Sequence, residues 1–145
     1  YLSDTGTQIG IRQTRSIVGE SILRNDDVIQ AKKNKNAVTF SAWPIESHGS
    51  QGVKIVYVEN DHYDIPFETL IPRHSINLLV AGRCMSAEHE ALASARVTAQ
   101  CFGMGYAVGA ACNLMEKEKL NAAQLSGVMI KDWMKKLKLK TANEQ

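Results

Sequence analysis

Residues that could do chemistry gather between Asn77 and Ala111. The apolar run Ile76–Gly82 ends in a glycine, a polar loop follows, and a helix rich in Gly and Ala begins near Thr98. In open α/β sheets, ligands bind beyond the carboxyl ends of strands, and a helix amino end offers free N–H groups to an anionic or electron-rich ligand. Each glycine costs a helix about 1 kcal/mol relative to Ala, which suggests close approach by another backbone or by a ligand. From these residues alone, a ligand site and ordinary packing are equally favoured.

The cysteines do not form a metal-binding pattern. Cys84, Cys101 and Cys112 are separated by 17 and 11 positions, no C-x-x-C pair occurs, and no histidine lies at metal-ligand spacing from them. We therefore predict no metal and reduced thiols, which are typical of a cytoplasmic protein.

Apolar patterning predicts the elements that position these side chains. Alternation indicates strands over 7–23, 37–43 and 53–58, an extended segment over 62–70, and a loop over 46–52. Helices are expected from Asn25 to about Lys32, from about Thr98 to 116, and from about Asn121 onward. The continuous apolar pattern of 76–82 favours a strand buried on both faces, as in a parallel sheet.

Three segments of the chain resemble one family, in that family's order. They are 10–20 (GIRQTRSIVGE), 63–72 (YDIPFETLIP) and 77–111, which begins NLLVAGRCMSAEHE. They are similar to segments of the FAD-dependent oxidoreductases, relatives of the glutathione-reductase-like and fumarate-reductase-like flavoproteins. The third segment resembles the family's C-terminal flavin-binding signature. Two features depart from the pattern: no window matches the dinucleotide fingerprint G-x-G-x-x-G, and Tyr106 stands where such families often carry Gln.

The resemblance implies an α+β fold in two regions. Residues 1–75 would form a mostly β substrate-side or cap region with an antiparallel sheet. Residues 76–145 would carry the last strand and two helices of a FAD-binding Rossmann-like layer.

The resemblance also implies which residues touch the cofactor. They are Gly82, Arg83, Cys84, Ser94, Arg96, Thr98, Ala99 and Gln100. Gly82 would let the cofactor approach the backbone, and Arg83 would pair with phosphate oxygens beside the ribityl chain. The amides of residues 98–100 would face the pyrimidine edge of the flavin, where the helix dipole stabilises negative charge. Roles for Arg83 and Arg96 as surface arginines or members of structural ion pairs stay open.

Catalytic residues are not identified, although Arg12, His62 and His89 are weak candidates. Arg12 and Arg15 lie three apart on the predicted strand and so point to opposite faces, which lets at most one of them face a flavin. His62 has the alternative of a simple turn residue. His89 has that of an exposed helix pair with Glu90.

Composition limits the partners. The net charge is only +2, which does not predict nucleic-acid binding. No apolar run reaches the roughly 18 residues of a membrane-spanning helix, so no membrane partner is expected. The chain begins Tyr-Leu-Ser-Asp, without an initiator Met or a signal-peptide pattern, and we expect a piece of a longer protein.

We therefore expect the C-terminal segment of a FAD-dependent oxidoreductase that supplies the ribityl and isoalloxazine contacts of the cofactor site, with no substrate identified. The isolated chain is expected to be inactive. It is also expected to expose an apolar surface that binds either the N-terminal FAD-binding portion or another copy of itself. The alternative is a non-enzymatic α+β binding or assembly module that has lost cofactor binding.

Overall fold

The computed structural model describes residues 3–8, 10–49, 52–59 and 61–137. Within these ranges the chain forms four α-helices and two antiparallel sheets of two strands each, which confirms the predicted α+β class. In chain order the elements are α1 (Asn25–Ile29), β1 (Ala37–Ser41), β2 (Ile45–Gly49), β3 (Gly52–Val56), β4 (Tyr63–Pro66), α2 (His89–Ala95), α3 (Thr98–Glu118) and α4 (Gly127–Lys136). Short 3₁₀ helices cover Phe67–Leu70, Gly82–Cys84 and Ala122–Gln124.

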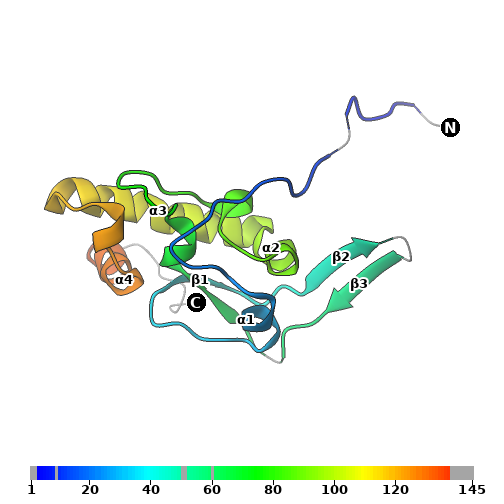
Figure 1. Ribbon diagram of the computed structural model, residues 1–145, viewed down its shortest axis with the longest axis horizontal. Helices are drawn as coiled ribbons and strands as arrows, with labels where there is room; N and C mark the ends of the chain where they lie inside the picture. The colour runs from blue at the N-terminus through cyan, green and yellow to red at the C-terminus, as the bar shows by residue number, and fades with distance from the viewer. Residues whose placement is uncertain (1–2, 9, 50–51, 60, 138–145) are drawn as a thin grey trace.

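The β1–β4 sheet lies at the centre of the molecule, and α3 and α4 pack against β1 (Figure 1). Val38, Tyr63 and Ile65 of this sheet share one buried core with Met104 of α3 and Ile130 of α4. The core therefore draws on residues both before and after position 75, and the division of the chain there stays a prediction.

Two glycines let helices approach the central sheet closely. A side chain at Gly103 of α3 would collide with Thr39 of β1, and one at Gly127 of α4 would collide with the backbone of Asn36. The close approach that the Gly-rich helix suggested is thus made at Gly103 by another part of the same chain.

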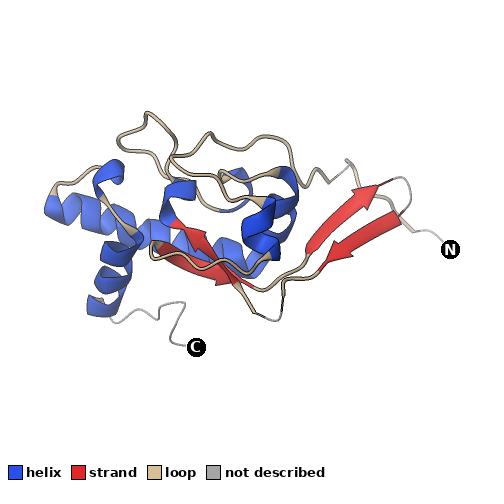
Figure 2. Ribbon diagram, turned by 60° about the horizontal axis from the view of Figure 1, so that its bottom comes forward, coloured by secondary structure: helices blue, strands red, loops and turns tan. Residues whose placement is uncertain are grey.

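The second sheet is a hairpin of β2 and β3 that projects from the body of the molecule (Figure 1, Figure 2). Ile45 pairs with Val56, and Gly49 pairs with Gly52. The loop predicted over 46–52 is therefore wrong for residues 46–49 and for Gly52, and residues 50–51 lie outside the described range. Alternation of apolar and polar residues arises from burial of one face, and a ribbon that is largely exposed does not require it.

The N-terminal segment is not the strand predicted over 7–23. Residue 9 lies outside the described range, and the β-bridges of the described residues are isolated ones, Gly19 to Pro72 and Leu23 to Ala87. Ile11 and Val18 are exposed. The β-branched composition indicated extended backbone, but a strand also needs a continuous neighbour for its hydrogen bonds.

The apolar run 76–82 is also not a strand, which corrects the predicted last strand of a Rossmann-like layer. Residues 76–81 form a loop, Gly82 begins a 3₁₀ helix, and Ile76 and Leu78 are 69% and 54% exposed. A continuous apolar run predicts a doubly buried strand only where other strands and helices cover it. In the described part of the chain, no strand pairs with this run.

The helices agree better with the patterning. The predicted helices near Asn25 and Thr98 are confirmed as α1 and α3, whereas α4 begins later than expected. The Ser126 hydroxyl accepts a hydrogen bond from the Met129 amide at 3.2 Å, which fixes the start of α4 at Gly127 instead of near Asn121. Among the described residues, no helix is both long enough and apolar enough to cross a membrane.

Candidate functional site

The polar loop after the apolar run folds against the first turn of α3. Gly82 has a left-handed backbone conformation (φ +75°), and a Cβ there would lie 3.1 Å from the Cys101 Sγ. Both the conformation and the contact favour glycine. The segment Gly82–Cys84 is thereby held beside the residues with which α3 begins.

Cys101 links this loop to the end of α2. Its Sγ donates a hydrogen bond to the Arg96 carbonyl oxygen at 3.3 Å. Burial, and then the neighbouring Cys84, raise the pKa of the Cys101 thiol against the opposing effect of the Arg96 charge. The thiol therefore stays protonated and able to donate. Cys84 is exposed, and its Sγ lies 3.6 Å from the Ala81 carbonyl oxygen.

The amino end of α3 has uncapped N–H groups. Val97, at the N-cap position, has an extended backbone, and its carbonyl oxygen accepts a hydrogen bond from the Cys101 amide at 3.1 Å. No side chain caps the helix. The amides of Thr98, Ala99 and Gln100 have no hydrogen-bond partner among the described residues. These donors, with the positive end of the helix dipole, are available to a ligand.

Three arginines from separate segments meet beside this helix end, and we refer to Arg12, Arg83 and Arg96 as the arginine cluster. The Arg83 Nη1 donates to the Ile11 carbonyl oxygen at 2.6 Å, which places Arg83 beside the Arg12 segment. Arg96 directly follows α2, next to Cys101 and so to Gly82. No carboxylate of the described chain lies within 4.0 Å of these guanidinium groups.

Arg96 is the most confined member of the cluster. Its Nε is buried and has no hydrogen-bond partner. Burial lowers the pKa of the Arg96 guanidinium, and the positive charges of Arg12 and Arg83 act in the same direction, against the attraction of Glu46. The site therefore holds positive charge that the described chain does not neutralise.

Two implied cofactor residues turn their side chains into the core. The Ser94 hydroxyl is fully buried, donates to the Trp43 carbonyl oxygen at 2.6 Å, and lies 2.7 Å from the Tyr63 hydroxyl. The Gln100 Nε2 donates to the Ser41 Oγ at 2.8 Å, and the Gln100 Oε1 is buried without a partner. Ser94 therefore presents no hydroxyl to the site, and Gln100 presents only its backbone amide.

Neither candidate histidine forms a side-chain hydrogen bond or ion pair with the arginine cluster among the described residues. His62 contacts the Asp61 carboxylate at 2.7 Å in the turn before β4. His89 is exposed, and its carbonyl oxygen accepts a hydrogen bond from the Gln13 Nε2 at 3.3 Å. Sequence reasoning assigned nothing to His48, yet its Nε2 lies 2.9 Å from the Arg12 Nη1. No local signal joins these two residues, because the contact depends on the β2–β3 hairpin.

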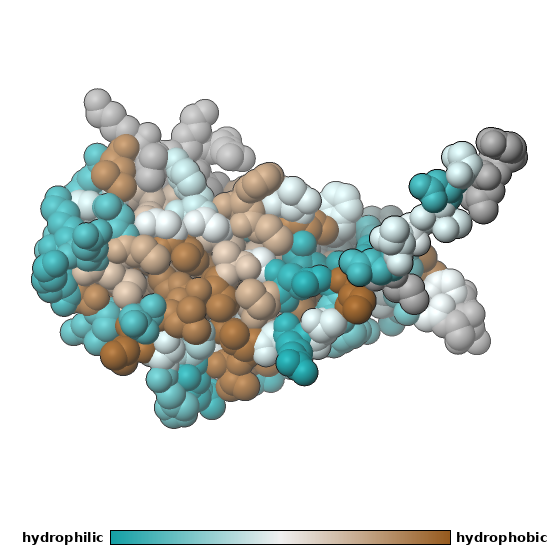
Figure 3. Space-filling model, turned by 90° about the horizontal axis from the view of Figure 1, so that it is seen from above, coloured by the Kyte–Doolittle hydropathy of each residue, from teal (hydrophilic) through white to brown (hydrophobic). Residues whose placement is uncertain are grey.

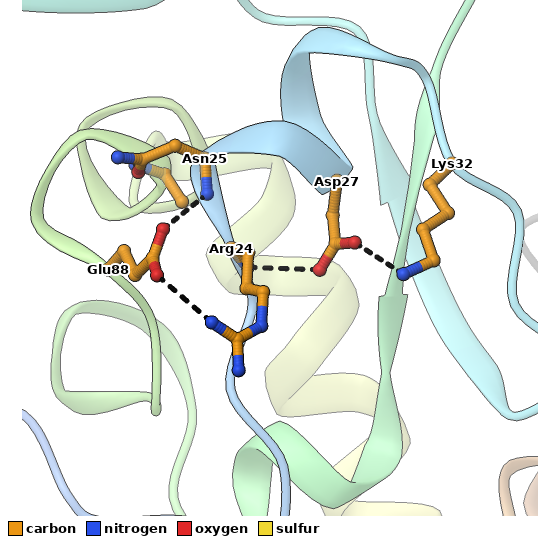
Figure 4. A network of polar contacts seen from close by, with 6 residues as sticks. Arg24, Asn25, Asp27, Lys32 and Glu88 are labelled. Atoms are coloured by element: carbon orange, nitrogen blue, oxygen red, sulfur yellow. Dashed lines mark hydrogen bonds and ion pairs between the residues drawn. The ribbon is translucent and has the colours of Figure 1, made fainter.

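A cavity of about 670 Å³ lies elsewhere, between the segment 16–24 and α1, and contains none of the implied cofactor residues. Beside it is the ion-paired network, made of Arg24, Asn25, Asp27, Lys32 and Glu88 (Figure 4). Asp27 contacts the Lys32 Nζ at 2.6 Å, and Glu88 lies 3.5 Å from Arg24 and accepts the Asn25 amide at 2.8 Å. Because none of the implied cofactor residues lines the cavity and this network is paired within the chain, we place the functional site at the arginine cluster.

The outer face of α3 is apolar and uncovered. Phe102 and Tyr106 are 74% and 46% exposed, and Gly105 and Gly109 have open space where a side chain would lie. Seen from above, the molecule shows an apolar area bordered by hydrophilic side chains (Figure 3). Exposed apolar surface of this kind marks a binding or assembly surface.

Comparison with known proteins gives one match. A family model described as FAD dependent oxidoreductase matches residues 1–138. No curated protein and no solved structure matches the chain. The matched range contains the arginine cluster, the segment Gly82–Cys84 and the amino end of α3.

Proposed function

The chain belongs to the family of FAD-dependent oxidoreductases, and from that membership we propose that it supplies flavin-side contacts of an FAD site in a hydride-transferring enzyme. FAD is the cofactor that the family implies. The ribityl and isoalloxazine contacts would come from Gly82–Cys84 and the amino end of α3. The observation that carries this proposal is the set of unpaired amides at Thr98, Ala99 and Gln100.

The chemistry of these groups fits a flavin. The pyrimidine edge of the ring accepts hydrogen bonds and becomes more negative on reduction. Helix amides and the positive end of the dipole favour that charge. The buried Nε of Arg96 is a further unpaired donor next to the same helix end. The donor set of the described residues is thus suited to an electron-rich and anionic group.

When bound, FAD supplies the hydride-transfer chemistry. The contribution of this chain is electrostatic and positional. The α3 amides donate hydrogen bonds where negative charge develops, and they are already oriented for it by the helix. The arginine cluster adds positive potential beside them. Gly82, held against Cys101, fixes the position of the loop relative to the helix end.

A second candidate function is a non-enzymatic binding or assembly module that has lost cofactor binding. The uncovered apolar face of α3, with Phe102 exposed and Gly105 open, favours it. Under either function, that face would be covered by the N-terminal FAD-binding portion of a longer protein or by another copy of the chain.

Replacing Thr98 by proline tests the flavin proposal directly. Proline is tolerated at the first position of a helix, and Val97 before it already has the extended backbone that proline requires (φ −71°, ψ 158°). The Thr98→Pro variant removes one amide donor, whereas Thr98→Ala removes the hydroxyl and keeps the amide. Titration with FAD, followed by flavin absorbance, should show affinity reduced by up to about tenfold in Thr98→Pro and unchanged in Thr98→Ala.

Equal stability of the two variants in urea unfolding would show that the proline leaves the fold intact. Equal FAD affinity in both variants would contradict the assignment of the α3 amides. Protein that stays colourless after addition of FAD and gel filtration would leave either the second function or a chain that binds FAD only together with the N-terminal FAD-binding portion.

A further inference from the structure

We propose that Arg12, Arg83 and Arg96 bind the carboxylate group of an organic-acid substrate, an assignment that rests on the proposed flavin site beside them. The three residues lie on segments far apart in the sequence, and only the fold brings them together. The ligand class follows from the charge, donor geometry and position of the cluster.

Hydrogen bonds within the chain establish the convergence. Arg83 donates to the Ile11 carbonyl oxygen at 2.6 Å, directly before Arg12. Arg96 is joined to the other side of the loop, because its carbonyl oxygen accepts from Cys101 and a Cβ at Gly82 would lie 3.1 Å from that sulfur. The backbones next to Arg12 and at Arg96 therefore both lie near the segment Gly82–Cys84, and the charges of Arg12 and Arg83 act on Arg96.

The cluster lacks a counter-charge. Glu46 attracts Arg96, yet neither it nor any other carboxylate of the described chain lies within 4.0 Å of a cluster guanidinium. Among the other described cations, Arg24, Lys32 and Lys33 meet a carboxylate within that distance, whereas Arg15 and Arg73 do not. The cluster differs from these last two in that the charges of Arg12 and Arg83 act on Arg96. Like charges held together without an anion repel one another, and a bound carboxylate removes that repulsion.

The geometry of an arginine guanidinium matches that of a carboxylate. The Arg96 Nε is buried with no partner, and an arginine fork binds the two oxygens of a planar carboxylate in parallel. Arg12 contacts His48, whose Nε2 lies 2.9 Å from the Arg12 Nη1. Because a guanidinium can only donate, His48 accepts this bond as a neutral ring and acts as a positioning residue.

The position of the cluster favours substrate over cofactor as the source of the anion. The FAD phosphates are a second source of negative oxygens. However, the α3 amides next to the cluster are assigned to the flavin ring, which leaves the cluster at the reacting end of the cofactor. The hairpin residue His48 and the segment before Arg12 also belong to the region predicted as the substrate side.

The test uses acetate as a carboxylate probe and observes the arginine Nε–H signals of the nitrogen-15-labelled protein by NMR. Acetate is titrated against chloride at constant ionic strength, without FAD and then with FAD present. We expect saturable shifts of the Arg96 and Arg12 signals, and acetate affinity reduced by about tenfold or more in Arg12→Gln and in Arg96→Gln. Arg15→Gln is the matched control, since Arg15 is exposed on the same segment, and it should bind acetate normally.

Each remaining outcome decides the proposal. Shifts that chloride reproduces, or equal acetate affinity in the Arg12→Gln and Arg15→Gln variants, would overturn it. Competition between FAD and acetate, with FAD affinity lost in Arg12→Gln, would assign the cluster to the cofactor phosphates and would also overturn it. Acetate binding that persists while Thr98→Pro leaves FAD affinity unchanged would retain the anion site and reject the flavin assignment alone.

Discussion

Helix α2 joins two polar regions whose charges are balanced differently. Glu88, directly before the helix, belongs to the ion-paired network, and Arg96, directly after it, belongs to the arginine cluster. In the network, Asp27 contacts Lys32 at 2.6 Å and Glu88 lies 3.5 Å from Arg24 (Figure 4). In the cluster, no described carboxylate lies within 4.0 Å of a guanidinium.

Under the proposed function, the difference separates charges that hold the fold from charges that would bind a ligand. Exposed ion pairs contribute only about 0–1 kcal/mol each, so the network stabilises mainly through hydrogen bonds to backbone amides. Glu88 accepts the Asn25 amide at 2.8 Å, and the Asn25 Oδ1 accepts the Ala91 amide at 2.8 Å, which ties α1 to α2. The cluster also joins segments, through the bond of Arg83 to the Ile11 carbonyl oxygen and the contact of Arg12 with His48, but it does so without an ion pair.

The largest expected effect is on the network side. Glu88→Ala removes the acceptor of the Asn25 amide and the partner of Arg24, and it should lower the free energy of unfolding by about 1.5–3 kcal/mol. Glu88→Gln retains an acceptor and should lose less. Urea unfolding of both variants beside Arg96→Gln checks the comparison. An equal loss of unfolding free energy in Arg96→Gln and Glu88→Ala would contradict the difference between the network and the cluster.

A smaller effect is expected where Ser94 of α2 contacts Tyr63 of β4. Tyr63→Phe removes the hydroxyl that lies 2.7 Å from the Ser94 Oγ and should cost about 1 kcal/mol of unfolding free energy. Burial raises the pKa of Tyr63 in the folded state above its ordinary value, with partial opposition from Ser41 and Ser94.

The sign of the pH dependence follows from that raised pKa. The neutral phenol is retained in the folded protein to higher pH than in the unfolded chain. The stability that the Tyr63 phenol contributes is therefore fully present below its unfolded-state pKa of about 10. It is lost as the pH rises through the folded-state pKa. Unfolding measured on the alkaline side should show a steeper loss in the unmodified protein than in Tyr63→Phe. Identical pH profiles would contradict the role of Tyr63.

The smallest expected effect is on the cluster itself. Arg12→Gln relieves repulsion among three exposed or half-buried arginines and should raise the free energy of unfolding at low ionic strength by less than about 0.5 kcal/mol. The gain should vanish in high salt, where the charges are screened. Arg15→Gln should show no such salt-dependent gain. A net loss of stability in Arg12→Gln at low salt would make Arg12 a structural residue.

Local patterns predicted the helices of this fold better than its strands. Asn25 with its acidic first turn, and the long apolar period after Thr98, are signals contained within a few turns of chain, and α1 and α3 form there. The strands predicted over 7–23 and 76–82 did not form, because a strand requires a neighbouring strand to pair with and local patterns do not show whether one is present. The hairpin strand β2 formed despite a polar sequence because β3 offered it a partner.

For the candidate site, the sequence by itself determined the parts that are local. Local patterns identified the glycine at position 82 and the amino end of α3, because a turn and a helix terminus are encoded by adjacent residues, and the family resemblance implied Arg83 and Arg96. Tertiary structure alone decided that Ser94 faces the core, that His48 holds Arg12, and that Arg12 joins Arg83 and Arg96. The physical reason is that charge balance is a sum over neighbours in space. Segments separated by tens of residues become neighbours only when the chain folds.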